Sequence, residues 1–249
     1  MNQIISDSLL QIPSINLAEL ECVSLQNRID SKYLLNSTML DKLFPFIIEN
    51  YRVLEIEGHR IFTYENNYFD TEDLLFYHEH HNGYLNRIKV RSRKYLETGS
   101  CFFEIKKKEK IDRTNKIREK TNELISAPNH EMIQKILGMS RKELKGIHKV
   151  LSNHFNRITF VNKAETERMT LDFNISFADN QLEKRLDDIF VLEIKQSKCS
   201  GHSSINEIIK ENNIREQGFS KYIYGVMLLK DAVKRNNFLP LLKKINSLH

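Results

Sequence analysis

The sequence predicts an α+β fold in which antiparallel strands dominate and helices lie between them and at the end of the chain. Several segments alternate charged and apolar residues with a period of two, which is typical of strands with one buried face. Other segments place apolar residues at helical intervals. The 249 residues include only eight Gly and four Pro, with no internal repeat and no clear linker. We therefore expect a single domain over residues 1–249.

The same two periodicities assign the elements along the chain. Strands are predicted at 27–34, 51–56, 61–70, 87–93, 103–108, 115–118, 155–161, 167–178 and 191–195. Helices are predicted at 17–22, 37–50, 71–81, 129–151, 203–212, 220–235 and 239–247, the last two forming a C-terminal helical section of about 220–248. Ser37 or Thr38 is expected to cap the second helix, and Thr71 to open the third.

Cations stand at every second position of residues 87–93, so they share one face of a strand, and 103–108 and 115–118 repeat the pattern. Like charges opposite one another destabilise a sheet, which makes a polyanion the obvious compensating ligand. The net charge is only +5, so the signal lies in where the cations sit. Periodicity does not separate an open charged sheet from a barrel with charges in its lumen.

The charged faces also carry three carboxylates, at Glu104, Asp172 and Glu193. They would repel a phosphate backbone unless they hold a divalent ion, and few aromatic residues are available to stack on bases. We therefore expect a metal–polyphosphate ligand and no nucleic acid. For any one strand, a solvated polar face is the simpler explanation.

Several other classes of protein are excluded by what the sequence lacks. It shows no P-loop, protein-kinase signature or Rossmann fingerprint. The histidines of 78–81 do not have the i, i+4 spacing of a helical zinc site. Three widely spaced cysteines indicate a reducing compartment, so we expect a cytoplasmic protein. No segment reaches the roughly 20 apolar residues of a membrane span, and a membrane partner is left open.

Eight short motifs occur in an order that matches a known family. They are Arg28-Ile-Asp30-Ser-Lys32-Tyr33, Tyr68-Phe-Asp70-Thr71, Asn86-Arg87-x-Lys89-x-Arg91-x-Arg93, Phe103-Glu104-x-Lys106, Phe155-x-Arg157-x-x-Phe160, Arg168-x-Thr-Leu-Asp172, Val191-Leu-Glu193-Ile-Lys195 and Ser220-Lys221-Tyr222. Together they resemble the VTC domain, the catalytic domain of the vacuolar transporter chaperone polyphosphate polymerases. That domain belongs to the CYTH-like triphosphate tunnel metalloenzymes.

The resemblance implies a closed antiparallel β-barrel, the triphosphate tunnel, wrapped by α-helices. It implies transfer of the γ-phosphate of ATP to polyphosphate or pyrophosphate, with Mn²⁺ or Mg²⁺ as cofactor. The implied metal ligands are Glu193 and Glu104. The implied catalytic residues are Lys32, Arg91, Arg93, Lys106 and Lys221, and the implied substrate-binding residues are Arg87, Lys89, Lys116, Arg118, Arg157, Arg168, Lys195 and Ser220.

Two positions depart from the family pattern. Arg28 stands where the CYTH hydrolases carry their first glutamate, and Phe155 replaces a tyrosine. The first departure favours the polymerase branch. The rival functions are a metal-dependent triphosphatase and a non-catalytic receptor for polyphosphate or nucleotides. Mutual repulsion is expected to lower the pKa of the tunnel lysines in the empty protein.

Overall fold

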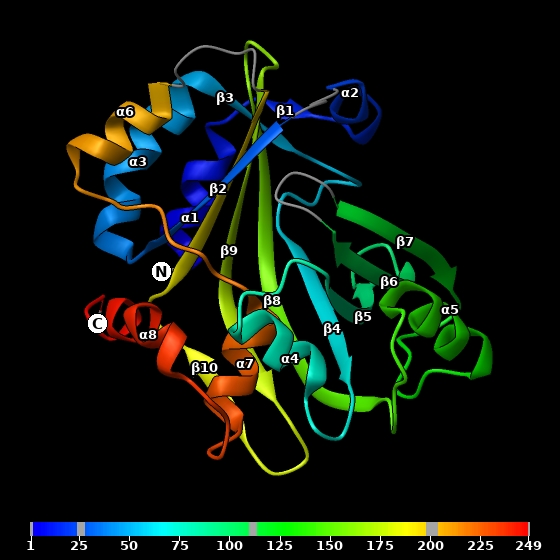
Figure 1. The fold of residues 1–249 in the computed structure, drawn as a ribbon. Helices are drawn as coiled ribbons and strands as arrows, with labels where there is room; N and C mark the ends of the chain where they lie inside the picture. Colours follow the sequence, from blue (N-terminus) through cyan, green and yellow to red (C-terminus); the bar gives the residue numbers. More distant parts are fainter. Residues whose placement is uncertain (1, 24–27, 110–113, 198–203, 249) are drawn as a thin grey trace.

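One curved sheet forms the centre of the computed structural model, which describes residues 2–23, 28–109, 114–197 and 204–248 (Figure 1). Hydrogen-bonded neighbours along the sheet follow the order β2-β11-β9-β8-β4-β5-β6-β7, and every pair in it is antiparallel. These strands are β2 (Arg28–Leu35), β4 (Phe62–Asp70), β5 (Arg87–Tyr95), β6 (Cys101–Lys108), β7 (Thr114–Thr121), β8 (His148–Asn162), β9 (Glu167–Ala178) and β11 (Phe190–Ser197). Three short strands, β1 (Ser14–Ile15), β3 (Tyr51–Leu54) and β10 (Glu183–Leu186), extend the sheet beside β8 and β9.

Helices cover the sheet in three groups, each with its own hydrophobic core. The first group covers the outer face of β2, β11 and β9 and comprises α1 (Asn2–Leu10), α3 (Ser37–Asn50) and α6 (Ser204–Glu211) (Figure 1). On the outer face of β5 and β6 lies α5 (His130–Ser140), together with Phe76 of α4 (Leu75–His81). The third core lies on the inner face and includes α7 (Lys221–Leu229), α8 (Leu239–Asn246) and part of α2 (Leu17–Cys22).

The sheet curves until inner-face side chains from opposite ends of the strand order approach one another. The segment 216–221 links β2 to β5 across the inner face. Its Gln217 N–H donates to the Lys32 carbonyl oxygen of β2 (2.7 Å), and Ser220 Oγ accepts from Lys89 Nζ of β5 (2.8 Å). Within the described ranges, no hydrogen bonds join β2 to β7. The predicted α+β class, with an antiparallel sheet wrapped by α-helices, is confirmed. Among the described strands, the expected closure into a barrel is not made by a hydrogen-bonded β2–β7 pair.

Most predicted elements are confirmed to within a few residues, and two helices need correction. The helix predicted at 129–151 ends at Ser140, because Arg141 takes a left-handed conformation (φ 55°), and residues 148–151 begin β8. The helix predicted at 220–235 ends at Leu229, where Lys230 becomes extended; the 3-10 helix η1 (Asn236–Phe238) follows. Residues 27 and 203, at the ends of two predicted elements, lie outside the described residues.

Two helix caps also differ from expectation. The side chain of Asn36, and not Ser37 or Thr38, accepts the N–H of Met39 and begins α3. The helix expected from Thr71 begins at Leu75, because the buried Asp70 carboxylate accepts the N–H groups of Phe76 and Tyr77 (2.9 Å each). The elements α1, β1 and β10 were not predicted, because they are short or carry no clear periodicity.

Gly225 lets α7 approach the inner face of the sheet. A Cβ at this position would stand 2.7 Å from Cδ1 of Phe177 and 3.0 Å from Cδ2 of Leu151, both buried in the inner core. Close approach of the helix is what carries Lys221, at its first turn, to the charged part of the inner face.

We predict that Gly225→Ala lowers the free energy of unfolding by about 1–3 kcal/mol, because the added methyl group overpacks the core. Gly138→Ala in α5 is the matched control. Nothing lies within 4 Å of its added Cβ, so it should gain up to ~1 kcal/mol from helix propensity. Urea denaturation of both variants checks this, and equal stabilisation of the two would contradict the packing described for α7.

Candidate active site

Strand alternation delivers the predicted cations to the inner face of the sheet. On β5, β6 and β7 the outward residues pack in the outer core, as Ile88, Phe103 and Ile117 do. The intervening residues therefore point inward. Seven of the twelve cations predicted as site residues lie on these three strands. Three carboxylates, the buried Glu104 and Asp172 and the half-buried Glu193, divide most of the twelve into ion-pair clusters.

Glu104 of β6 lies at the centre of the first cluster. Its carboxylate accepts from Arg91 Nε (2.6 Å) and lies 3.5 Å from both Lys116 Nζ and Arg118 Nε. Burial raises the pKa of Glu104, but the charges of Arg91 and Arg93 outweigh burial and bring it to about 2. This carboxylate is ionised at neutral pH and balances part of the positive charge of Arg91 on β5 and of Lys116 and Arg118 on β7.

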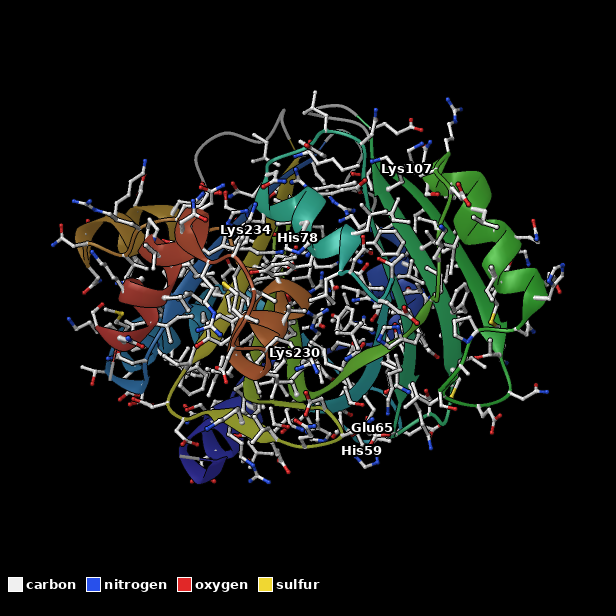
Figure 2. All side chains as sticks on the ribbon, turned by 60° about the horizontal axis from the view of Figure 1, so that its bottom comes forward. His59, Glu65, His78, Lys107, Lys230 and Lys234 are labelled. Atoms are coloured by element: carbon white, nitrogen blue, oxygen red, sulfur yellow. The ribbon has the colours of Figure 1, made fainter. Side chains whose placement is uncertain are left out.

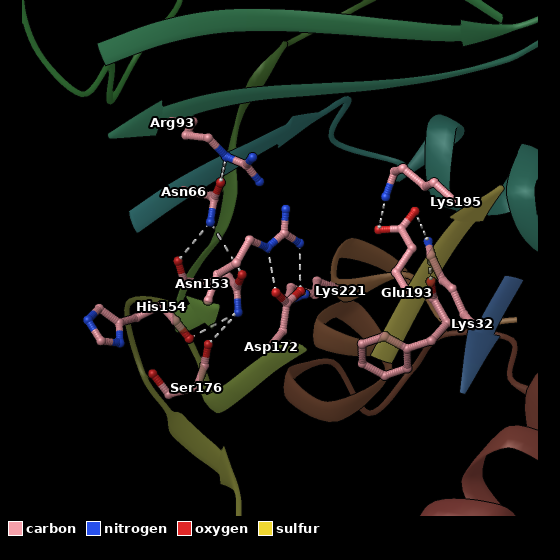
Figure 3. A network of polar contacts seen from close by, with 12 residues as sticks. Lys32, Asn66, Arg93, Asn153, His154, Asp172, Ser176, Glu193, Lys195 and Lys221 are labelled. Carbon is pink, nitrogen blue, oxygen red and sulfur yellow. Dashed lines mark hydrogen bonds and ion pairs between the residues drawn. The ribbon is translucent and has the colours of Figure 1, made fainter. Parts of the chain in front are cut away.

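Asp172 of β9 is the centre of the second cluster (Figure 3). It accepts two hydrogen bonds from Arg157 (2.5 and 2.8 Å) and forms an ion pair with Lys221 at the start of α7. Burial lowers the pKa of Lys221 to about 8, although the Asp172 charge opposes the shift. The cluster thus fixes α7 to the sheet.

Glu193 of β11 holds the third cluster (Figure 3). Its carboxylate lies 3.0 Å from Lys195 Nζ and 3.9 Å from Lys32 Nζ. Burial raises the pKa of Glu193, while Lys32 and Lys195 together lower it to about 2. Lys106 has no ion-pair partner among the described residues; partial burial, together with the nearby charge of Lys32, lowers its pKa.

Lys89 joins the sheet to α7 through its hydrogen bond to Ser220 Oγ. Burial holds the pKa of Lys89 well below its usual range, and Lys32 and Lys106 add to the shift. The predicted lowering of lysine pKa values on the inner face is therefore confirmed at Lys89, Lys106, Lys195 and Lys221, with burial as the leading cause and neighbouring cations contributing.

Three predicted site residues make contacts outside these clusters. Arg93 donates to Asn66 Oδ1 (2.7 Å) and lies over the ring of Tyr64. The guanidinium of Arg87 donates to the Tyr84 carbonyl oxygen in the loop after α4 (2.9 Å). That of Arg168 donates to the Leu20 carbonyl oxygen at the end of α2 (2.5 Å), away from the three carboxylates. Their predicted roles toward substrate stay predictions.

Sequence reasoning did not identify the polar and aromatic residues that hold these cations in place. Asn66, itself buried, donates weakly to Asn153, which donates to the Ser176 carbonyl oxygen (Figure 3). Tyr68 stacks on Tyr222 of α7 with ring centroids 5.3 Å apart. Tyr68 and Tyr222 occur in the quoted motifs, but nothing in the sequence marked them or Asn66 as contacts that position the cations.

The histidines and the glutamate of 78–81 separate in the structure. Glu79 forms an ion pair with Lys142, and the His81 ring accepts from the Asn237 N–H (3.4 Å). No group of three or more His, Cys, Asp or Glu side chains gathers as a metal site in the part of the chain that the structure describes. Nor does any helix of that part have the length and apolar character needed to cross a membrane.

The family described as the VTC domain matches residues 27–230, which include all three clusters. The chain belongs to this family. No curated protein shows a significant sequence match to it.

Solved structures similar to this VTC domain protein include a putative adenylate cyclase from Bacillus halodurans (13% identity, 86% of this chain, 100% of that chain, TM-score 0.49). A putative adenylyl cyclase from Hippeastrum, described as having a dominant triphosphatase activity, is 13% identical over 80% of this chain and 95% of that chain, with a TM-score of 0.48. An RNA triphosphatase from S. pombe is 10% identical over 99% of this chain and 92% of that chain, with a TM-score of 0.31.

The donor set fits a small divalent cation that binds with a substrate. Such an ion takes one or two carboxylates and completes its shell with water and phosphate oxygens. Glu193 and Glu104 are both ionised, and each now faces cations that a phosphate chain would draw away. Glu193 is the better candidate for the metal ligand. Its nearest partner is Lys195 at 3.0 Å, whereas Glu104 is held by the Arg91 guanidinium at 2.5 Å.

We predict that Glu104→Gln lowers stability at pH 7 by about 1–2 kcal/mol, because it removes the buried counter-ion of the half-buried Arg91 guanidinium, which solvent partly screens. The folded pKa of Glu104, about 2, lies below its usual 4.5. Its contribution is therefore complete above pH 4.5 and is lost as pH falls towards 2.

Urea denaturation across pH 7 to 2 should accordingly show the wild type and Glu104→Gln converging. Glu131→Gln removes an exposed carboxylate that pairs with Lys135 and serves as the control. Its curve should run close to that of the wild type. A constant gap between wild type and Glu104→Gln at every pH would show that the charge of Glu104 does not stabilise the fold.

Proposed function

We propose that this VTC domain protein is a polyphosphate polymerase that transfers the γ-phosphoryl group of ATP to a growing polyphosphate chain. The observation that carries the proposal is the gathering of Arg91, Arg157, Lys221 and their neighbours around only a few carboxylates on one inner face. Phosphoryl transfer depends mainly on positioning and on stabilising charge on equatorial oxygens, which such a surface provides.

In the proposed reaction the bond between the γ-phosphorus of ATP and the β–γ bridging oxygen breaks. A new bond forms from that phosphorus to a terminal oxygen of the chain, and ADP leaves with the bridging oxygen. Lys32, Arg91 and Arg93 would bind the triphosphate, with Lys106 and Lys116 beside them. A Mn²⁺ or Mg²⁺ ion held by Glu193, with Glu104 assisting, would neutralise charge on the phosphate oxygens.

Arg28 supports synthesis over hydrolysis. A hydrolase has to hold a water in line with the phosphorus, commonly with a carboxylate near it. Arg28 occupies the position at which the hydrolase pattern has its first glutamate, and it forms an ion pair with Asp30 (2.9 Å). That pairing engages the remaining carboxylate at this end of β2. A cation here favours an anionic acceptor over water.

We predict that the purified protein, incubated with ATP and Mn²⁺, forms ladders of polyphosphate on a polyacrylamide gel while ADP accumulates. Little free phosphate should appear early. Lys221→Ala should slow elongation about 100-fold, the usual effect of removing one charge-stabilising donor, and should reduce ATP binding less. Lys230→Ala, at the far end of α7 and paired with Asp179, is the matched control (Figure 2). Phosphate released in step with ADP, without chains, would identify a triphosphatase, and binding without turnover a receptor.

We predict that Glu193→Gln removes metal-dependent turnover, because the amide keeps the shape but loses the charge that a divalent ion needs. Tripolyphosphate binding without metal should persist or strengthen, as a repelling charge has gone. Thermal shift with and without Mn²⁺ measures the binding. Glu65→Gln is the matched control, because it makes the same substitution on β4, outside the three clusters (Figure 2). Its turnover should match that of the wild type. Wild-type turnover in Glu193→Gln would exclude Glu193 as the ligand.

A further inference from the structure

His80 is a polar residue of α4 whose role the three clusters do not explain. Its ring is half-buried and lies near Phe238, with centroids 6.0 Å apart. Nδ1 is enclosed and has no hydrogen-bond partner among the described residues. An unsatisfied buried polar atom costs about 1–3 kcal/mol, so a further hydrogen bond at Nδ1 would be stabilising.

The neighbours of His80 on α4 are used to hold the fold together. Glu79 pairs with Lys142, and the His81 carbonyl oxygen accepts from Asn237 Nδ2 (2.8 Å). Tyr77 donates to the Lys234 carbonyl oxygen (2.6 Å). These contacts fix the helix on both sides of His80 and leave its ring free of any structural hydrogen bond at Nδ1.

Positive charges on three strands act on the His80 ring. They belong to Lys89 and Arg87 of β5, Lys108 of β6 and Lys32 of β2. Burial is the leading cause that lowers the pKa of His80, to about 2, and the four cations lower it further. The ring is therefore neutral in the empty protein at pH 7. Lys32, Arg87 and Lys89 are among the residues that the family resemblance assigns to catalysis or substrate binding, so a bound polyanion would oppose the part of the shift that these charges cause.

We infer that His80 is a further phosphate-binding residue at the α4 end of the inner face, and that its imidazole takes up a proton when a polyphosphate chain or nucleotide triphosphate binds. The inference rests on the proposed function. The proton comes from solvent, a ring nitrogen accepts it, and the resulting N–H donates to a phosphate oxygen. Binding of the anion is then linked to pH through a side chain of α4, in addition to the lysines of the sheet.

The test uses the whole protein, sodium tripolyphosphate without metal, and NMR of ¹³C-labelled histidine at pH 6.5. His80→Asn identifies the His80 signal by its loss. His78→Asn, two residues earlier on the same helix, is the matched control (Figure 2). We expect tripolyphosphate to move the His80 signal to the imidazolium position and to leave the His78 signal where it is.

Calorimetry in two buffers of different ionisation enthalpy then measures proton uptake on binding. His80→Asn should take up fewer protons and bind about tenfold more weakly, and His78→Asn should match the wild type. His80→Gln provides a second variant if the first does not fold. Tripolyphosphate that binds while His80 stays neutral, or that binds His80→Asn as tightly as wild type, overturns the inference alone. A wild type that does not bind tripolyphosphate overturns the proposed function with it.

Discussion

The whole molecule depends on balancing partly buried positive charge on the inner face of one sheet. Taking an unpaired ion out of water costs several kcal/mol even after relaxation, so the more buried of these cations, such as Arg157 and Lys221, need counter-charges. Glu104, Asp172 and Glu193 provide them, each shared between two or more cations. The balance is incomplete, since Lys106 and Lys89 have no carboxylate partner within the described ranges. The remaining positive charge is what a polyphosphate chain would neutralise.

The part of the inner face on which α7 and α8 pack is apolar. Packing there fixes the position of α7, and with it the position of Lys221 on the charged part of the face. Asp70 joins the two, because its carboxylate accepts the first N–H groups of α4 as well as the hydroxyl of Tyr222 in α7. Burial raises the pKa of Asp70, and these hydrogen bonds oppose the rise. Helix α7 is thereby held at a fixed distance from β4, and Lys221 meets Asp172 as a consequence.

The strands could be predicted from the sequence, because alternation of charge reports directly on which face is buried. Alternation alone places Arg91, Glu104 and Glu193 on a shared charged surface. It does not predict which carboxylate pairs with which cation, because register between strands distant in the chain leaves no local signature. The end of α5 was missed for a related reason: residues 144, 147 and 150 fit a helical period, yet Arg141 had already ended the helix. His80 could not be singled out, since only the fold brings the cations of β5 and β6 to it.

The segment 216–221 links β2 to β5 and also carries two of the proposed ligand contacts. Gln217 is hydrogen-bonded to the backbone of β2, Ser220 to Lys89, and Lys221 is paired with Asp172. The distance between β2 and β5 and the positions of the Ser220 and Lys221 side chains therefore depend on the same segment. An insertion or deletion within these six residues would change both the distance between β2 and β5 and the positions of Ser220 and Lys221. Apart from Ser220 and Lys221, such a segment tolerates substitution far better than it tolerates a change of length.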